Sequence, residues 1–241
     1  MTDIHSHIIF DVDDGSKSIE ESIELLRQMK EVGFDNVIIT PHYIANTGYD
    51  ATNDIKLEKL EILRNEVKKE KIDINLYLGN EIYISNHILE DIKDGNIYTL
   101  NNSKYLLFEL PFHNQILNLE DTIYELKISG FTPILAHPER YDYFQDNYRL
   151  VDKLKEEGLL FQCNFASITG FYNKRSQKLM KYMLKKGYVD YLGTDIHHTY
   201  KAYTLEKFAL IKKKIIKIAG EDYYNKIIEN GNNILKEESI R

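Results

Sequence analysis

Residues 131–140 read Phe-Thr-Pro-Ile-Leu-Ala-His-Pro-Glu-Arg, and they show the pattern from which the fold can be predicted. It starts directly after Gly130, which ends an amphipathic, charge-rich segment, as glycine does when it closes a helix in the left-handed conformation. The apolar run 131–136 is typical of a strand buried on both faces, and His137 follows where that strand ends. The stretch therefore predicts a helix, a buried strand and a polar side chain at the strand's C-terminal end.

The same order recurs along the chain. Gly33, Gly158 and Gly187 also end charge-rich segments and are followed at once by apolar runs. The predicted strands are residues 4–8, 36–40, 74–78, 105–110, 131–136, 159–164 and 188–193. Strands that alternate with helices imply an α/β fold with a parallel sheet, either an open doubly wound sheet or a closed barrel.

The composition is that of a globular protein. The 241 residues are 43% hydrophobic and 29% charged, and we expect a single domain spanning 1–241. One cysteine excludes a disulfide framework, and a formal net charge of -7 argues against nucleic acid or an anionic membrane as the main partner. Apolar runs are too short to insert into a bilayer and no signal peptide is evident, so a cytoplasmic location is expected.

Polar residues follow six of the seven predicted strands. They are His5, His7 and Asp14, then His42, Glu81, Glu109 and His137, and finally Asp195 and His197. In a (β/α) barrel all C-terminal strand ends meet on one face, where active sites are built. This distribution favours the barrel over the open sheet.

So many carboxylates in one small site would raise one another's pKa unless cations were bound among them. Mixed imidazole and carboxylate ligands suit zinc, iron or manganese better than calcium. Nine ligands exceed the needs of one ion, so the pattern predicts two or three. Any one of these residues taken alone is more often structural than a ligand, but five of the eight histidines stand at strand ends.

The ordered set of motifs resembles the PHP (polymerase and histidinol phosphatase) superfamily, and within it the bacterial protein-tyrosine phosphatases of capsule and exopolysaccharide biosynthesis. The motifs are His5-Ser6-His7, Asp13-Asp14-Gly15, Thr40-Pro41-His42, Gly79-Asn80-Glu81, Phe108-Glu109-Leu110, His137-Pro138-Glu139-Arg140 and Thr194-Asp195-Ile196-His197. The resemblance runs to about residue 200. It implies a distorted (β/α)7 TIM-like barrel of the PHP fold, with its metal site at the C-terminal strand ends.

The resemblance also implies a site with two or three ions, usually manganese, with iron or zinc as alternatives. One ion would be held by His5, His7, Glu81 and Asp195. Glu81 would bridge to a second ion held by Glu109 and His137, and Asp14, His42 and His197 would hold the third. A metal-bridged hydroxide would then hydrolyse the phosphotyrosine monoester of a partner protein, for which the family implies the tail of a tyrosine autokinase.

Two positively charged side chains are expected beside the metal ions. Arg140 follows a ligand strand and is placed to clamp a phosphate oxygen, the alternative being a surface salt bridge with Glu139 or Asp142. Family members commonly carry a second arginine after the Asp-x-His motif, where this chain offers Lys201. Four tyrosines lie close behind predicted ligands and are candidates to stack on the substrate ring: Tyr43, Tyr83, Tyr141 and Tyr200.

Two other functions remain open. One is a small-molecule phosphatase of the same superfamily, such as a histidinol phosphatase, and the other is a non-catalytic metal-binding module. A cysteine-dependent tyrosine phosphatase is excluded, because the only cysteine, Cys163, lies inside an apolar strand and has Thr169 six positions later in place of arginine.

Overall fold

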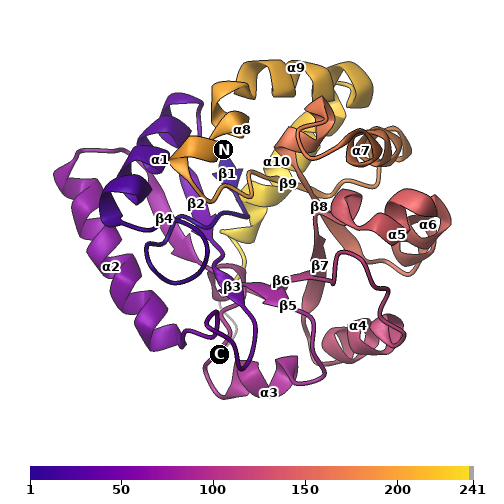
Figure 1. Ribbon diagram of the computed structural model, residues 1–241, viewed down its shortest axis with the longest axis horizontal. Helices are drawn as coiled ribbons and strands as arrows, with labels where there is room; N and C mark the ends of the chain where they lie inside the picture. Colours follow the sequence, from indigo (N-terminus) through magenta and orange to yellow (C-terminus); the bar gives the residue numbers. More distant parts are fainter. Residues whose placement is uncertain (239–241) are drawn as a thin grey trace.

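The computed structural model describes residues 1–238, without the side chain of Lys201, and forms a ring of parallel strands with helices around it (Figure 1). The strands are β1 (Thr2–Asp3), β2 (Asn36–Ile39), β3 (His42–Tyr43), β4 (Asn75–Leu78), β5 (Glu81–Tyr83), β6 (Tyr105–Glu109), β7 (Thr132–Ala136), β8 (Leu160–Asn164) and β9 (Tyr191–Gly193). The principal helices are α1 (Ile19–Glu31), α2 (Asn53–Lys69), α3 (Ile88–Lys93), α4 (Leu119–Ile128), α5 (Asp142–Asp146), α6 (Tyr148–Glu156), α7 (Lys174–Lys186), α8 (Tyr203–Glu206), α9 (Phe208–Ala219) and α10 (Glu221–Ile234).

The strands form two parallel ladders that continue each other. The first has the order β1-β2-β4 and the second β3-β5-β6-β7-β8-β9. β2 and β3 are two halves of one strand interrupted at Thr40-Pro41, and β4 and β5 are likewise interrupted at Gly79-Asn80. A parallel bridge between Ser6 and Ile196 joins the end of the chain's last strand to its first. This is the distorted seven-stranded α/β barrel expected from the sequence.

The distortion lies between β4 and β6, which share no ladder within residues 1–238. The 3-10 turn Leu100–Asn102 lies against both strands there. Its Leu100 packs so closely on Gly79 that a Cβ atom at Gly79 would be 2.8 Å from Leu100 Cδ2. A side chain at position 79 would therefore force Leu100 to shift.

Two predicted strands are shorter than expected. Residues 4–8 contribute only the bridge at Ser6, because the His7 carbonyl accepts from Ser16 N at 3.0 Å instead of from a neighbouring strand. Gly15 lies so close that a Cβ there would be 2.1 Å from the same oxygen. Of the predicted strand 188–193, only residues 191–193 form a strand, β9. Before it, Phe161 N donates to the side chain of Asp190 rather than to a backbone carbonyl of this segment.

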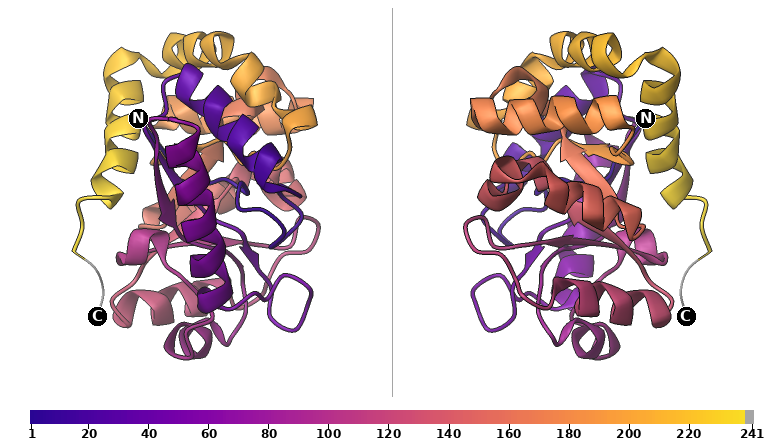
Figure 2. Two further views of the ribbon diagram at one scale, coloured as in Figure 1. Left: turned by 90° about the vertical axis from the view of Figure 1, so that its left-hand side faces the viewer. Right: turned by 90° about the vertical axis from the view of Figure 1, so that its right-hand side faces the viewer.

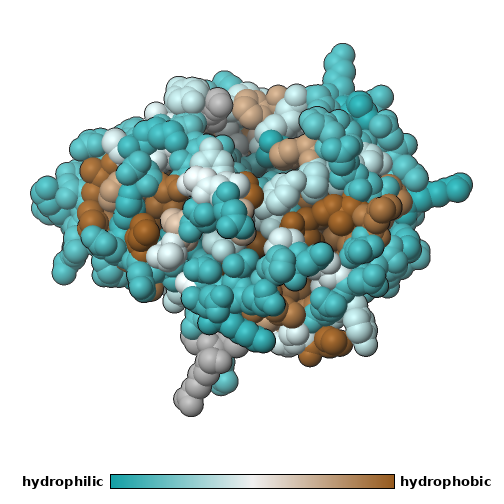
Figure 3. All heavy atoms as spheres, turned by 60° about the horizontal axis from the view of Figure 1, so that its bottom comes forward, coloured by the Kyte–Doolittle hydropathy of each residue, from teal (hydrophilic) through white to brown (hydrophobic). Residues whose placement is uncertain are grey.

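Helices cover the outside of the ring, and α10 packs against the amino ends of the strands (Figure 2). Ile234 of α10 shares a core cluster with Ile4, Ile38 and Leu107. α1 begins after Ser18, whose Oγ accepts from Glu21 N. Hydrophobic side chains on the face in Figure 3 form separate patches among hydrophilic ones. None of the helices in the described residues combines the length and the apolar character needed to cross a bilayer.

Candidate metal centre

The nine side chains that follow the strands all lie at one end of the barrel. His42 lies in β3 and Glu81 lies in β5, and the two residues pair with each other across the ladder. Because β5 also pairs with β6, Glu109 of β6 lies close to both. The remaining six lie in the segments after β1, β7 and β9: His5, His7, Asp14, His137, Asp195 and His197. The geometry therefore brings together residues that are up to 192 positions apart along the chain.

The innermost group consists of His5, His7 and Glu81. The Nε2 atoms of the two imidazoles are 3.2 Å apart, and they lie 3.1 Å and 3.2 Å from Oε2 of Glu81. All three side chains are buried. Two imidazole nitrogens and a carboxylate oxygen thus point at one another in the buried interior of the barrel.

Two further groups adjoin it. His42 Nδ1 lies 3.2 Å from Glu81 Oε2 and 3.1 Å from Glu109 Oε1, and its Nε2 lies 3.6 Å from Asp14 Oδ1. His197 Nε2 is 3.6 Å from the same Asp14 oxygen. The resemblance assigns His42 to Asp14 and His197 alone, whereas here His42 lies between that pair and the two glutamates.

His137 and Asp195 complete the cluster from β7 and β9. His137 Nε2 is 2.7 Å from Glu81 Oε1, and Asp195 Oδ1 lies 3.7 Å from Nε2 of both His5 and His7. Both residues have positive φ, 34° for His137 and 51° for Asp195. A left-handed backbone is costly for residues with a Cβ and tends to occur at functional sites.

Several buried atoms of the cluster have no hydrogen-bond partner among the described residues. They include Glu81 Oε2, His42 Nδ1 and His137 Nδ1. Buried polar atoms are nearly always satisfied, so these unpaired atoms require an explanation. Divalent cations among these lone pairs supply one, and imidazole with carboxylate is a donor set that zinc, iron and manganese accept. The residues present therefore fit a metal centre.

The electrostatics of the cluster agree with that fit. Burial lowers the pKa of His5, but the carboxylates of Glu81 and Asp195 outweigh it and raise the pKa to about 9. Burial raises the pKa of Glu81, yet His5, His42 and His137 hold it well below its ordinary 4.5. The carboxylates thus attract positive charge strongly, which bound protons or a divalent cation can equally provide.

Three polar residues that the sequence prediction missed orient the candidate ligands. Asp13 Oδ2 accepts from His7 Nδ1 at 2.7 Å and from the backbone N–H of His42 at 2.8 Å. Gln162 Oε1 lies 2.8 Å from His5 Nδ1, and Asn164 Nδ2 donates to Asp195 Oδ2 at 2.6 Å. Hydrogen bonds of this kind fix the orientation and tautomer of a metal-binding histidine.

A buried lysine stabilises the backbone next to two of the candidate ligands. Lys56 of α2 is fully buried, and its Nζ donates to Asn80 Oδ1 and to the Asn96 carbonyl, both at 2.7 Å. Asn80 in turn donates to the Pro41 carbonyl at 2.9 Å. Lys56 therefore ties together the two strand interruptions that precede His42 and Glu81. Burial without a counter-ion lowers its pKa from 10.5 to about 7.

Arg140 lies at the mouth of the site rather than on the outer surface. Its Nη1 donates to Asp195 Oδ2 at 2.7 Å, so the alternative pairing with Glu139 or Asp142 is wrong. The guanidinium is held between two aromatic rings, 4.8 Å from the centroid of Phe112 and 4.5 Å from that of Tyr172. The side chain of Lys201 lies outside the described residues.

A cavity of about 400 Å³ opens at this mouth. Asp14, Asp195 and His197 form its inner wall, and Arg140, Phe171 and Tyr172 form another side. Two of the tyrosines expected to stack on a substrate ring cannot do so, because Tyr43 and Tyr141 are buried and use their hydroxyls inside the fold. Tyr83 is half-buried, whereas Tyr200 is exposed and stacks on His198.

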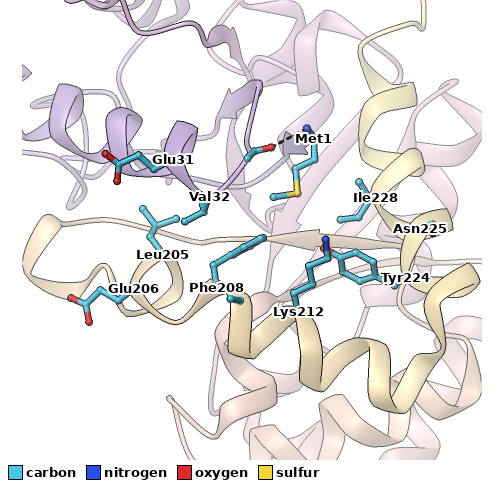
Figure 4. A pocket seen from close by; sticks show the side chains of 12 residues that line it. Met1, Glu31, Val32, Leu205, Glu206, Phe208, Lys212, Tyr224, Asn225 and Ile228 are labelled. Atoms are coloured by element: carbon cyan, nitrogen blue, oxygen red, sulfur yellow. Dashed lines mark hydrogen bonds between the residues drawn. The ribbon is translucent and has the colours of Figure 1, made fainter.

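A second cavity, of about 650 Å³, lies away from the cluster. Figure 4 shows Leu205 and Phe208 on one side of it, and Ile228 of α10 on another with Lys212 beside Tyr224. None of the nine candidate ligands lines it. The chemistry that the strand ends assemble therefore belongs to the smaller cavity at the mouth.

Comparison with known proteins identifies relatives along the whole chain. Residues 1–236 match the family described as Capsular polysaccharide synthesis, CpsB/CapC. The sequence is 34% identical to CapC of Staphylococcus aureus, over 100% of this chain and 93% of that protein. It is 29% identical to the tyrosine-protein phosphatase CpsB of Streptococcus agalactiae, over 100% of both.

A solved structure has the same fold with a TM-score of 0.91. It is 27% identical and covers 100% of this chain and 96% of the other. It belongs to work on YwqE from Bacillus subtilis and CpsB from Streptococcus pneumoniae, described as unique metal-dependent tyrosine phosphatases. The match extends through the strands that carry all nine candidate ligands and Arg140.

Proposed function

Because this chain belongs to the capsular polysaccharide synthesis CpsB/CapC family, we propose that it is a metal-dependent protein-tyrosine phosphatase. The observation that carries the proposal is the buried cluster around Glu81, whose Oε2 has no hydrogen-bond partner yet lies within 3.2 Å of nitrogens of His5, His7 and His42. Nine candidate ligands favour two or three ions, and we propose manganese. A non-catalytic module is disfavoured, since structural zinc sites are closed and use few carboxylates.

Divalent cations held by these residues would activate a water molecule and offset the negative charge of the phosphate. The protein's own part is to hold the ligands and to position the ester. Asp13 and Gln162 each accept the outward-facing N–H of an imidazole, which leaves the inward-facing nitrogens of His7 and His5 free to coordinate.

Arg140 is the residue that we propose binds the phosphate. Nη1 meets Asp195, and no other side-chain nitrogen of Arg140 has an acceptor among residues 1–238, so further N–H donors face the cavity. The rings of Phe112 and Tyr172 keep the guanidinium from turning away. Such a fixed donor stabilises charge on a phosphoryl oxygen without first having to be ordered.

The phosphotyrosyl ring would lie against Phe171 and Tyr172 in the same cavity. The mouth is open enough for a side chain presented by another protein, and a tail of a bacterial tyrosine autokinase is the substrate that we propose. Both aromatic residues lie between η3 (Phe165–Thr169) and α7, a segment for which the sequence offered no functional signal.

The test compares two phosphate monoesters with one preparation. Protein stripped of metal is refilled with manganese, its metal content is measured, and initial rates are recorded on a phosphotyrosyl peptide and on histidinol phosphate. A higher kcat/KM on the peptide supports the proposal. A higher value on histidinol phosphate makes the protein a small-molecule phosphatase, and failure to hydrolyse either ester when fully loaded makes it a binding module.

A further inference from the structure

The outer surface of α7 and α9 carries positive charge without any acidic residue. α7 has six lysines and arginines and α9 has four, and neither helix contains Asp or Glu. The two helices pack against each other on the outside of the barrel (Figures 1 and 2). With a whole-chain net charge of -7, the remainder of the protein carries a formal charge of -17. Positive charge is therefore concentrated on α7 and α9, although the whole chain is acidic.

Six lysines make up this surface, which we call the lysine face: Lys174, Lys178, Lys181 and Lys185 of α7, and Lys213 and Lys217 of α9. The four in α7 follow the i, i+4, i+7, i+11 spacing of a single helical stripe. All six reach solvent, and none forms an ion pair within residues 1–238. Their charge is available to a partner.

The arrangement is unfavourable for the isolated helix. Lys174 and Arg175 stand at the start of α7, where the helix dipole favours negative charge, whereas α1 and α4 have acidic residues in their first turns. Lys174 and Lys178, and likewise Lys213 and Lys217, are like charges one turn apart. A partner that carries negative charge would relieve this repulsion.

We propose that the lysine face docks the protein on an anionic phospholipid bilayer. The surface is the outside of two helices rather than a groove, which suits a flat partner better than an extended peptide. The unpaired cations are all lysines, whose compact charge suits diffuse attraction to headgroups, while the forked guanidinium of Arg175 is already paired with Asp146.

An exposed apolar side chain lies within the lysine face. Leu210 is 45% exposed and precedes Lys213 and Lys217 by three and seven residues, so it projects from the same side of α9. An apolar side chain beside lysines can enter the boundary between headgroups and acyl chains while the lysines contact the headgroups. Docking would place the site mouth beside the bilayer, because Asn173 and Ser176, at the start of α7, lie next to Arg140.

The first experiment measures binding of the full chain to vesicles by co-sedimentation. We expect binding to vesicles of phosphatidylcholine mixed with phosphatidylglycerol, no binding to phosphatidylcholine alone, and release by high salt, because surface attraction is screened beyond the Debye length. Equal binding to both kinds of vesicle, no binding to either, or binding that salt does not weaken would overturn the proposal.

The second experiment assigns the binding to the lysine face. The variant Lys178→Gln, Lys185→Gln, Lys213→Gln is compared with the control Lys68→Gln, Lys69→Gln, Lys93→Gln, which removes the same charge from exposed positions on α2 and α3. Each lysine near an anionic surface strengthens binding about fivefold, so the first variant should bind about a hundredfold more weakly and the control within about twofold of the parent. Equal losses in the two variants would overturn the assignment.

An acidic protein is the competing partner, and soluble polyglutamate tests it. Binding to polyglutamate that the lysine-face variant loses, without binding to phosphatidylglycerol vesicles, would replace the membrane with an acidic polypeptide. Both variants should keep the parent's circular dichroism spectrum and its rate on a phosphotyrosyl peptide. Loss of vesicle binding can therefore be separated both from misfolding and from failure of the proposed phosphatase activity.

Discussion

Replacing Lys56 by methionine should change the pH dependence of stability in a direction that the structure fixes. The ammonium group is fully buried, has no carboxylate partner within residues 1–238, and donates to Asn80 and Asn96. Its pKa falls from 10.5 to about 7 on folding because burial disfavours the charged form. Between these two values the unfolded chain binds more protons than the folded one, so the free energy of unfolding rises with pH.

The size of the effect follows from that pKa difference. One proton changes the free energy of unfolding by about 1.4 kcal/mol per pH unit across the interval. From about pH 6 to about pH 9 the parent protein should gain about 2–3 kcal/mol over Lys56→Met. The variant also loses two hydrogen bonds, each contributing about 0.5–1.5 kcal/mol at any pH. Lys56→Met should therefore be clearly destabilised at the higher pH and much less so at the lower one.

Urea unfolding of both proteins at the two pH values, with a chelator present, measures this difference. Titration of the clustered histidines and carboxylates affects both proteins alike and cancels in the comparison. Lys56→Arg offers a control that keeps a charge but cannot lose it. A free-energy difference between parent and Lys56→Met that is the same at both pH values would refute the reasoning, because it would show that Lys56 keeps one protonation state throughout.

Three further outcomes test the site. His42→Ala should lower turnover more than about a hundredfold, beyond the effect usual for residues that only orient ligands, with the circular dichroism spectrum unchanged; retained turnover at saturating manganese would remove His42 from the ligands. Asp13→Asn should weaken metal binding about 10–100-fold in competition with a chromogenic chelator, while unaltered affinity would contradict its role in orienting His7. Alkylating reagents should leave activity unchanged, since Cys163 is fully buried and burial raises the pKa of its thiol; stoichiometric inactivation would contradict this.

Much of the barrel was predictable because its strands are continuous apolar runs, four of which follow helix-ending glycines. The two interrupted strands were only half visible. Pro41 and Gly79 mark an end in the sequence, yet the ladder resumes at His42 and Glu81, because Asn80 and Lys56 satisfy backbone and side-chain groups at the breaks. These hydrogen bonds depend on Lys56 of α2, a helix that is not adjacent in sequence to either interruption. Local patterns carry no information about them.

In the site, too, some residues could be predicted from local sequence patterns and others could not. The nine candidate ligands share a simple signal, a histidine or carboxylate just after an apolar run. Gln162 and Asn164 do not, although their alternation within the buried strand β8 places both side chains on the same side and offered a usable clue. Arg140 was expected near phosphate, but its position between Phe112 and Tyr172 depends on loops that only the folded chain brings together.

The bridge between Ser6 and Ile196 also bears on when the proposed metal centre can be completed during synthesis. Asp3 and Thr194, which pair beside the bridge, are 191 residues apart. At about 5–20 residues per second, the ribosome needs roughly 10–40 s to synthesise that interval. His5 and His7 are synthesised at the start of this interval, whereas Asp195 and His197 are synthesised at its end. The proposed cation site can therefore be completed only late in synthesis, when the barrel closes, and a chain truncated before Ile196 should leave the ribosome without all nine candidate ligands.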